Sequence, residues 1–348
     1  MPVGAHLVGS VPLASAEEVF RSASASLGPH LRTLPDGETG VRKDWIAWQY
    51  AVLAATRGLE PIPPGDRAYL RPQLVRRTPG APPPAFGALG YADAALASFQ
   101  VFDRLQREGV IPRHVRFQVS LPTPLAPVTV FVAQADRDLV EPAYESALLA
   151  ELARILAGVP HDRLAVQWDV AAEFGLLEGL WPAHFEDVEH GVLLRLARCA
   201  HAVPAGVALG FHLCYGDFGH RHFVEPPDAS RLVRVANALA SMGRELAWVH
   251  LPVPKRWLSP AAFAPLARLA LPPETRRYLG VVHLTDGLDG ARRRIARARE
   301  VVPRFGIATE CGWGRRPPET VPTLLALHAE LLAPAESAWP LAHAPAHA

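Results

Sequence analysis

The sequence predicts an α/β fold, a single (β/α)₈ TIM barrel that spans residues 1–332. Three observations favour it. Eight short apolar runs recur along the chain, and helical patterns separate most of them. Alternating strands and helices give a parallel sheet with right-handed crossovers, and eight such units are the number that closes a barrel. The 348 residues are 49% hydrophobic, enough for a sizeable core, and barrels of this length commonly form one domain.

The predicted strands are short and end in polar or turn-forming residues. The first, residues 6–10, ends in Gly-Ser, and the second, residues 30–34, runs into a turn-rich loop over 35–40. The other six are expected at 115–120, 164–168, 207–211, 246–249, 278–282 and 305–309.

Helical patterns lie between these strands, and the expected helices are 16–27, 41–56, 91–108, 145–156, 188–201, 228–242, 290–302 and 319–332. Ser15 is a good N-cap for the first of them. The arginines at 292–294 are expected on a solvated helix face. A doubly wound open sheet is the alternative fold, but it usually has a Gly-rich phosphate loop after its first strand, and residues 9–12 do not form one.

Two segments fall outside the repeat. Residues 58–90 are dense in Pro and Gly, which predicts a loop insertion or lid after the second strand. Residues 333–348 are rich in Ala, Pro and His and are expected to form a flexible C-terminal tail.

Composition and charge disfavour several classes of partner. The formal net charge is +1 and no basic block is present, so neither nucleic acid nor a charged membrane surface is an expected partner. No run of about 18 apolar residues spans a membrane, and the N-terminus lacks the pattern of a signal peptide. Three cysteines are no disulfide framework and fit a reducing compartment, so we expect a cytoplasmic protein.

One stretch carries the strongest chemical signal. His212 and Cys214 are two residues apart at the end of the 207–211 run, and residues i and i+2 of a strand point to the same face. Cys311 follows the 305–309 run. If these two strand ends are neighbours, an imidazole and two thiols surround one point, which is a ligand set typical of zinc.

Other strand ends also finish in chemically active residue types. Active sites of barrels lie at the C-terminal ends of the strands, where this sequence places Ser10, Glu38, Asp169, His250 and His283. Each alone has a plainer explanation: a lone Cys is more often a small buried hydrophobe, as we expect for Cys199 within a helix. His250 could equally be a core histidine bonded to backbone, and His220 is a weaker ligand candidate.

Five segments together resemble one family. They are Val8-Gly9-Ser10-Val11-Pro12, Asp36-Gly37-Glu38-Thr39-Gly40-Val41-Arg42, Gln167-Trp168-Asp169-Val170-Ala171-Ala172-Glu173, His212-Leu213-Cys214-Tyr215 and Cys311-Gly312. In order and type they are similar to motifs in the catalytic barrel of cobalamin-independent methionine synthase, within the uroporphyrinogen decarboxylase/methionine synthase-like superfamily. The resemblance extends nearly from end to end of the chain, and its specific part is the His-x-Cys pair with a distant Cys.

The resemblance implies a zinc site and a substrate site. It makes His212, Cys214 and Cys311 ligands of Zn²⁺, and it places His250 where the family has a fourth ligand, a Glu. It also implies that Glu38 and Asp169 bind the amino group of an amino acid, with help from Ser10. Asp169 and His283 are the expected catalytic residues, with His283 in the place of the family's proton donor.

The expected function is zinc-dependent transfer of an alkyl group, methyl in the family, to a metal-activated thiol. The partners implied are a small-molecule thiol, an amino acid in the family, and an alkyl donor. The chain has only one barrel, and residues 121–127 replace the family's Trp-bearing segment. The superfamily also contains single-barrel zinc enzymes with other electrophiles, such as epoxyalkane:coenzyme M transferase. Two alternatives remain: a zinc-dependent lyase or hydrolase that uses metal-bound water or acts on a C–S bond, and a non-catalytic barrel with structural zinc.

Overall fold

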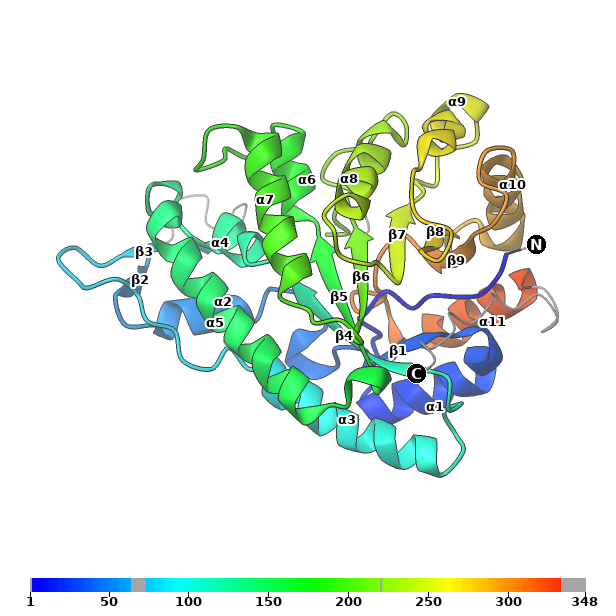
Figure 1. Ribbon diagram of the computed structural model, residues 1–348, viewed down its shortest axis with the longest axis horizontal. Coiled ribbons are helices and arrows are strands. Elements are labelled where there is room, and N and C mark those ends of the chain that lie inside the picture. Colours follow the sequence, from blue (N-terminus) through cyan, green and yellow to red (C-terminus); the bar gives the residue numbers. More distant parts are fainter. Residues whose placement is uncertain (1, 64–72, 220, 333–348) are drawn as a thin grey trace, which may run out of the picture.

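The computed structural model describes residues 2–63, 73–219 and 221–332. Within them, seven parallel strands form one curled sheet, in the order β1-β4-β5-β6-β7-β8-β9 (Figure 1). These strands are β1 (Thr33–Pro35), β4 (Arg116–Pro122), β5 (Leu164–Val170), β6 (Ala208–Leu213), β7 (Trp248–Pro252), β8 (Arg276–Val282) and β9 (Gly306–Thr309). Each overlaps one of the predicted strands from the second to the eighth, so the prediction of an α/β fold with parallel strands is confirmed.

The first predicted strand, residues 6–10, is not a strand, and the sheet is not closed into an eight-stranded barrel. The N-terminal segment instead lies between the two edges of the sheet. The His6 N–H donates to the Ile307 carbonyl at 2.9 Å on one side, and the Ala5 N–H donates to the His30 carbonyl at 3.1 Å on the other. The segment therefore occupies the position of the eighth barrel strand. It forms one isolated parallel bridge to β9, between Ala5 and Ile307.

Backbone bonds join residues 3–6 of this segment to Phe305 and Ile307, and side-chain amides hold its continuation at Leu7 and Val8. Gln118 Nε2 donates to the carbonyls of Leu7 and Val8 at 3.2 and 2.9 Å, and Gln167 Nε2 donates to Val8 at 2.6 Å. Buried carbonyls need such partners because leaving them unpaired costs about 1–3 kcal/mol each. The interior of the curled sheet is accordingly polar where Gln118 and Gln167 meet the N-terminal segment.

The helices surround the sheet (Figure 1), and the long ones match the predicted positions. They are α1 (Ala16–Leu27), α3 (Tyr91–Arg107), α5 (Arg137–Gly158), α7 (Val188–His201), α8 (Ser230–Ala240), α10 (Gly287–Arg299) and α11 (Val321–Leu331); α4 (Leu125–Phe131), α6 (Ala172–Leu177) and α9 (Pro260–Phe263) are shorter. Ser15 caps α1 by accepting the Glu18 N–H, as expected. Among the described residues, no helix has the length and apolar character needed to cross a bilayer.

Two local predictions need correction. The predicted helix 41–56 is reduced to α2 (Gln49–Ala55), because Trp45 has a φ of +56°, which a helix does not accommodate. Arg294 is not solvated: it is fully buried, and its guanidinium donates to both carboxylate oxygens of Asp286 at 2.7 and 2.8 Å.

The described part of the predicted 58–90 insertion contains an antiparallel hairpin, β2 (Leu59–Pro61) and β3 (Val75–Arg77). Residues 64–72, the predicted tail at 333–348 and His220 lie outside the described residues.

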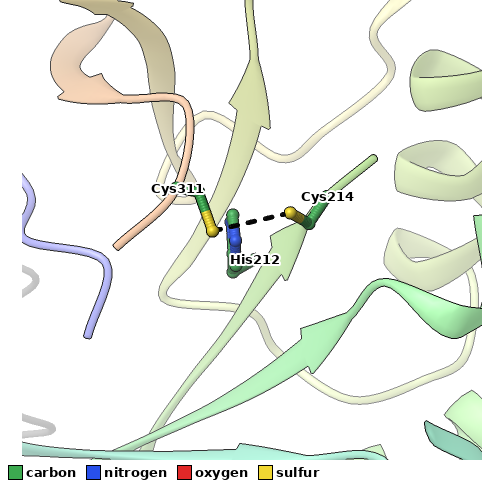
Figure 2. Close-up of side chains that lie close together, drawn as sticks. All are labelled: His212, Cys214 and Cys311. Atoms are coloured by element: carbon green, nitrogen blue, oxygen red, sulfur yellow. Dashed lines mark hydrogen bonds between the residues drawn. The ribbon is translucent and has the colours of Figure 1, made fainter. Parts of the chain in front are cut away.

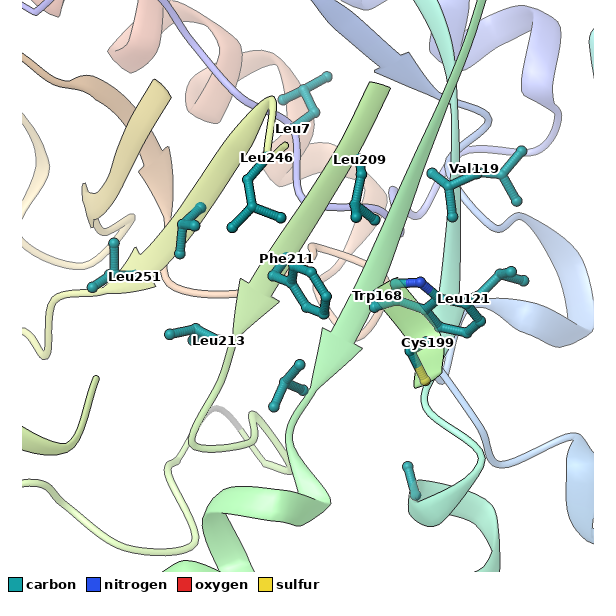
Figure 3. Packing of buried hydrophobic residues seen from close by; sticks show 14 of the residues in the cluster. Leu7, Val119, Leu121, Trp168, Cys199, Leu209, Phe211, Leu213, Leu246 and Leu251 are labelled. Atoms are coloured by element: carbon teal, nitrogen blue, oxygen red, sulfur yellow. The ribbon is translucent and has the colours of Figure 1, made fainter. Parts of the chain in front are cut away.

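The apolar core lies between the sheet and the helices and determines which way β6 presents its side chains (Figure 3). Leu209, Phe211 and Leu213 alternate along β6, and each is buried in this core. Burying a side chain of this size stabilises the fold by about 1.5–3 kcal/mol. Because side chains alternate along a strand, His212 points to the opposite, inner side of the sheet. Cys214, two residues later, points to the same inner side.

Candidate metal centre

Three side chains from two strand ends converge inside the curled sheet (Figure 2). The ligand atoms of His212, Cys214 and Cys311 all lie within 4.8 Å of one another. His212 belongs to β6 and Cys214 directly follows it, whereas Cys311 comes two residues after β9. The structure therefore brings together the three residues that sequence spacing proposed as a group. Cys199 lies apart from them, buried in α7 as expected.

The two sulfur atoms share a proton. A hydrogen bond joins Cys214 Sγ and Cys311 Sγ, which lie 3.7 Å apart, and the Gly216 N–H donates to Cys214 Sγ at 3.2 Å. The bond from Cys311 holds the pKa of Cys214 well below its ordinary value, and the same bond raises the pKa of Cys311. A thiolate is the form that binds a metal, so Cys214 is already suited to that role.

The hydrogen bonds of His250 determine the tautomer of His212. His250 Nε2 lies 3.0 Å from the Thr309 carbonyl, which only accepts, so Nε2 carries the proton. Burial lowers the pKa of His250 well below 6.5, so the ring is neutral and its Nδ1 accepts. That Nδ1 lies 2.7 Å from His212 Nδ1, which must then be the donor. In the neutral His212 ring, Nε2 then has its lone pair free, and this buried atom has no hydrogen-bond partner among the described residues.

His250 is thus not placed as the fourth ligand that we expected from the sequence. Both of its ring nitrogens are engaged, one by Thr309 and the other by His212. It lies on β7 directly beside His212 in the strand register, so it supports the His212 ring from behind. Partners of this kind orient metal-binding histidines and fix their tautomer.

The donor set fits zinc. One neutral imidazole nitrogen and two sulfurs are ligands that zinc prefers, and three protein ligands leave a fourth position open, as in catalytic zinc sites. The centre borders a cavity of about 670 Å³, which is also lined by Ser10, Glu38 and Asp169. The structure therefore places three further predicted site residues around the same space.

Two carboxyl groups in this cavity carry raised pKa values. Asp169 lies beside His212 in the strand register and accepts a hydrogen bond from Gln167 at 2.9 Å. Burial raises the pKa of Asp169 to about 7, although the nearby His212 and the Gln167 bond oppose this. Burial, followed by the charge of Asp169, raises the pKa of Glu38 well above 4.5. A cation bound between the two groups would relieve this repulsion.

The loop after β1 holds Glu38 in a strained conformation. Its φ is +47°, and its N–H donates to Asp36 Oδ1 at 2.8 Å. Arg42 anchors Asp36 in turn, with Nη2 2.7 Å from Oδ2. A Cβ added at Gly9 would lie 2.4 Å from Glu38 Oε1, so the carboxylate packs directly against the glycine backbone. Gly9 is therefore required for this position of Glu38.

Ser10 is tied to the loop that carries Cys311. Its hydroxyl accepts the Gly314 N–H at 3.2 Å, and its carbonyl accepts the Trp313 N–H at 2.6 Å. A Cβ at Gly312 would lie 2.4 Å from the Ser10 hydroxyl, so the two segments are in close contact. Ser10 positions the Cys311 loop as well as lining the cavity.

His283 does not line the cavity. Its Nε2 donates to the Val253 carbonyl at 2.9 Å, and its Nδ1 lies 3.1 Å from Glu310 Oε2. The second Glu310 oxygen lies 3.2 Å from Nε2 of His222, which does line the cavity. Against the effect of burial, the two histidines lower the pKa of Glu310 to about 2, and Glu310 raises that of His222 to about 9. Glu310 is not among the predicted site residues, although it directly precedes Cys311 at a strand end.

Comparisons with known proteins place the chain by its fold. No family model matches it, and no curated protein matches it by sequence. Its structure is similar to that of a protein from Listeria monocytogenes described as a vitamin-B12-independent methionine synthase, with 14% identity, a TM-score of 0.55, and coverage of 96% of this chain and 99% of that one. A methyltransferase from Methanosarcina mazei follows, with 15% identity, a TM-score of 0.49, and coverage of 93% and 95%. At such low identity, the first likeness shows a shared fold and nothing finer.

Proposed function

We propose that this protein catalyses zinc-dependent transfer of an alkyl group, in the first instance methyl, to a thiol. The observation that carries the proposal is the convergence of one imidazole nitrogen and two sulfurs within 4.8 Å, beside a large cavity. The fold shared with a protein described as a methionine synthase supports the choice of thiol alkylation over other zinc chemistry.

His212, Cys214 and Cys311 are the residues that would hold the zinc. When bound, zinc supplies an open position at which the pKa of a coordinated thiol falls, so that the thiol is a thiolate at neutral pH. His250 keeps the Nε2 lone pair of His212 directed at the metal position. Three protein ligands favour this catalytic role over a closed structural site, which uses four.

Glu38 and Asp169 would bind the thiol substrate through an ammonium group. Both carboxyl groups line the cavity, and burial raises the pKa of each. An ammonium group bound between the two carboxyl groups would lower both pKa values and would donate hydrogen bonds to both carboxylates. An amino-acid thiol such as homocysteine has the required ammonium and sulfhydryl groups.

Thiol methylation in a metal-defined preparation tests the proposal. Zinc-loaded protein is incubated with homocysteine and a panel of methyl donors, and thioether formation is followed by mass spectrometry. We expect turnover that needs both zinc and thiol and that is lost in Cys311→Ser. Equal turnover by metal-free protein, or product formation that does not consume thiol, would refute transfer; the second result would favour hydrolysis or elimination.

A further inference from the structure

Aromatic side chains form much of the cavity wall next to the metal centre, namely Trp45, Phe131, Trp181, Phe218 and Phe223. Two of them pack over glycines. A Cβ at Gly175 would lie 2.3 Å from the Trp181 ring, and one at Gly216 would lie 2.5 Å from the Phe223 ring. The Trp181 and Phe223 ring centroids are 5.2 Å apart at an interplanar angle of 49°. Trp181 and Phe223 therefore form a packed aromatic pair within this wall, whereas Phe218 is exposed.

Trp45 reaches the same cavity from the segment between β1 and α2. Its φ of +56° is unusual for a bulky residue and costs about 1–3 kcal/mol. Strain of this kind persists where the surrounding structure requires it, and it is concentrated at ligand sites. We take the strain as a sign that the position of this indole matters for what the cavity binds.

The charged residues of the cavity do not suit an anionic ligand. Four acidic residues line it, Glu38, Asp44, Asp169 and Asp217, against two arginines, Arg221 and Arg315, and His222, whose pKa Glu310 raises to about 9. Arg315 also lies 3.6 Å from Asp44, so part of its charge is already balanced. A donor with a polyanionic tail would need a surplus of arginine and lysine, which this lining lacks.

We propose that the alkyl donor is an onium compound, a methylsulfonium or a quaternary methylammonium, whose cationic centre lies against Trp45, Trp181 and Phe223. This inference rests on the proposed alkyl transfer and names its donor class. Aromatic faces attract such cations through the ring quadrupole, and Asp44 and Asp217 are the acidic lining residues that add to that attraction while Glu38 and Asp169 bind the thiol substrate. An acidic, aromatic wall suits this class better than a neutral or anionic donor.

The chemistry of an onium donor agrees with the position of His283, which lies away from the cavity lining. The substrate thiolate uses a sulfur lone pair to form a bond to the methyl carbon, and the bond from that carbon to the onium sulfur or nitrogen breaks. The electron pair of the broken bond stays on the leaving atom, which departs as a neutral thioether or amine. The leaving group needs no proton, and His283, the expected proton donor, is held by Val253 and Glu310 away from the cavity lining.

Calorimetric titration with a matched pair of probes tests the recognition step. Choline and its uncharged carbon isostere, 3,3-dimethylbutan-1-ol, are titrated into zinc-loaded and metal-free protein, with trimethylsulfonium as a second cation. We expect the cations to bind at least about tenfold more tightly than the isostere. Trp181→Leu, which keeps apolar bulk, should lose this preference, and Trp181→Phe, which keeps an aromatic face, should retain most of it. Thermal melting of both variants controls for folding.

Binding of the isostere as tightly as choline, or an unchanged preference in Trp181→Leu, would overturn the inference. A transfer assay separates this failure from that of the proposed function. Methylation of homocysteine by trimethylsulfonium, with release of dimethyl sulfide, supports both. Methylation only from uncharged or anionic donors overturns the onium inference and leaves alkyl transfer standing. Selective cation binding without methylation by any donor refutes the transfer, and with it the role of the cation as donor.

Discussion

His212 and His250 form a directed pair, with their Nδ1 atoms 2.7 Å apart inside the curled sheet. Because His250 gives its only proton to the Thr309 carbonyl, it can only accept from His212. The chain thus presents one histidine nitrogen to the metal position and uses the second histidine to hold the first in place.

His250→Phe should weaken zinc binding without changing the ligand set. The variant leaves the buried His212 N–H without its acceptor, and loss of such a supporting partner typically costs about 10–100-fold in metal affinity. Competition with a chromophoric chelator measures the affinity, and X-ray absorption at the zinc edge counts the imidazoles. We expect one imidazole in the wild-type protein. A spectrum with two would restore His250 as a ligand.

Cys214→Ser and Cys311→Ser should each reduce bound zinc from about one per chain to a small fraction of that. A hydroxyl is a poor zinc ligand at neutral pH, and only three protein ligands converge here. Cys199→Ala is the matched control, since Cys199 lies in α7 away from the centre. Metal analysis after dialysis measures the content. Full zinc retention in either serine variant would contradict the site.

Gly9→Ala should impair binding of the thiol substrate more than it impairs zinc binding. The new methyl group would lie 2.4 Å from Glu38 Oε1, so the carboxylate must leave its position. We expect the KM for an amino-acid thiol to rise about tenfold, the loss of one good charged hydrogen bond. Gly87→Ala is the control, because a Cβ there meets no described atom within 4 Å. An unchanged KM would remove Glu38 from the substrate site.

Glu173 should make the protein less stable as the pH rises. Burial raises its pKa to about 7, and Oε2 has no hydrogen-bond partner among the described residues. The folded state therefore holds a proton that the unfolded chain releases near pH 4.5. The contribution of this carboxyl group to the free energy of unfolding is full below that pH and is lost progressively up to about pH 7. Glu173→Gln should be more stable than wild type at pH 8, by up to about 3 kcal/mol, with little gain at pH 4.

Urea unfolding of both proteins at pH 4, 6 and 8 measures this difference. A gain in Glu173→Gln that is the same at all three pH values would show that the carboxyl group is not protonated in the folded state.

Gln167→Leu should destabilise the fold by about 2–3 kcal/mol. The variant leaves the Val8 carbonyl without this donor and removes the bond to Asp169 Oδ1. Gln134→Leu, at an exposed position, serves as control and should change stability by less than about 0.5 kcal/mol. Equal unfolding midpoints for the two variants would show that the side-chain amide is dispensable for holding the N-terminal segment.

The strands of the seven-stranded sheet could be predicted because each is an apolar run between turn signals. The first predicted strand is wrong because its carbonyls pair with glutamine side chains, contacts between residues more than a hundred positions apart. The sixth was placed at 246–249, whereas β7 runs from Trp248 to Pro252. His250 is therefore inside the strand and beside His212, not beyond its end.

The metal triad could be predicted because an i, i+2 pair and a distant strand end share one edge of the sheet. The acceptor role of His250 could not, because it depends on which atom of each ring faces which neighbour. The position of Glu38 likewise depends on a positive φ and on the space at Gly9, which residue type alone does not reveal.

The contact between Ser10 and the Gly312–Gly314 turn has a consequence for folding. It joins the tenth residue of the chain to a loop some 300 residues later, and the same loop carries Cys311. A chain emerging from the ribosome has His212 and Cys214 long before Cys311 is made. The triad, and with it tight zinc binding, therefore forms only after Cys311 has been made, which couples metal capture to the contact between Ser10 and the Gly312–Gly314 turn.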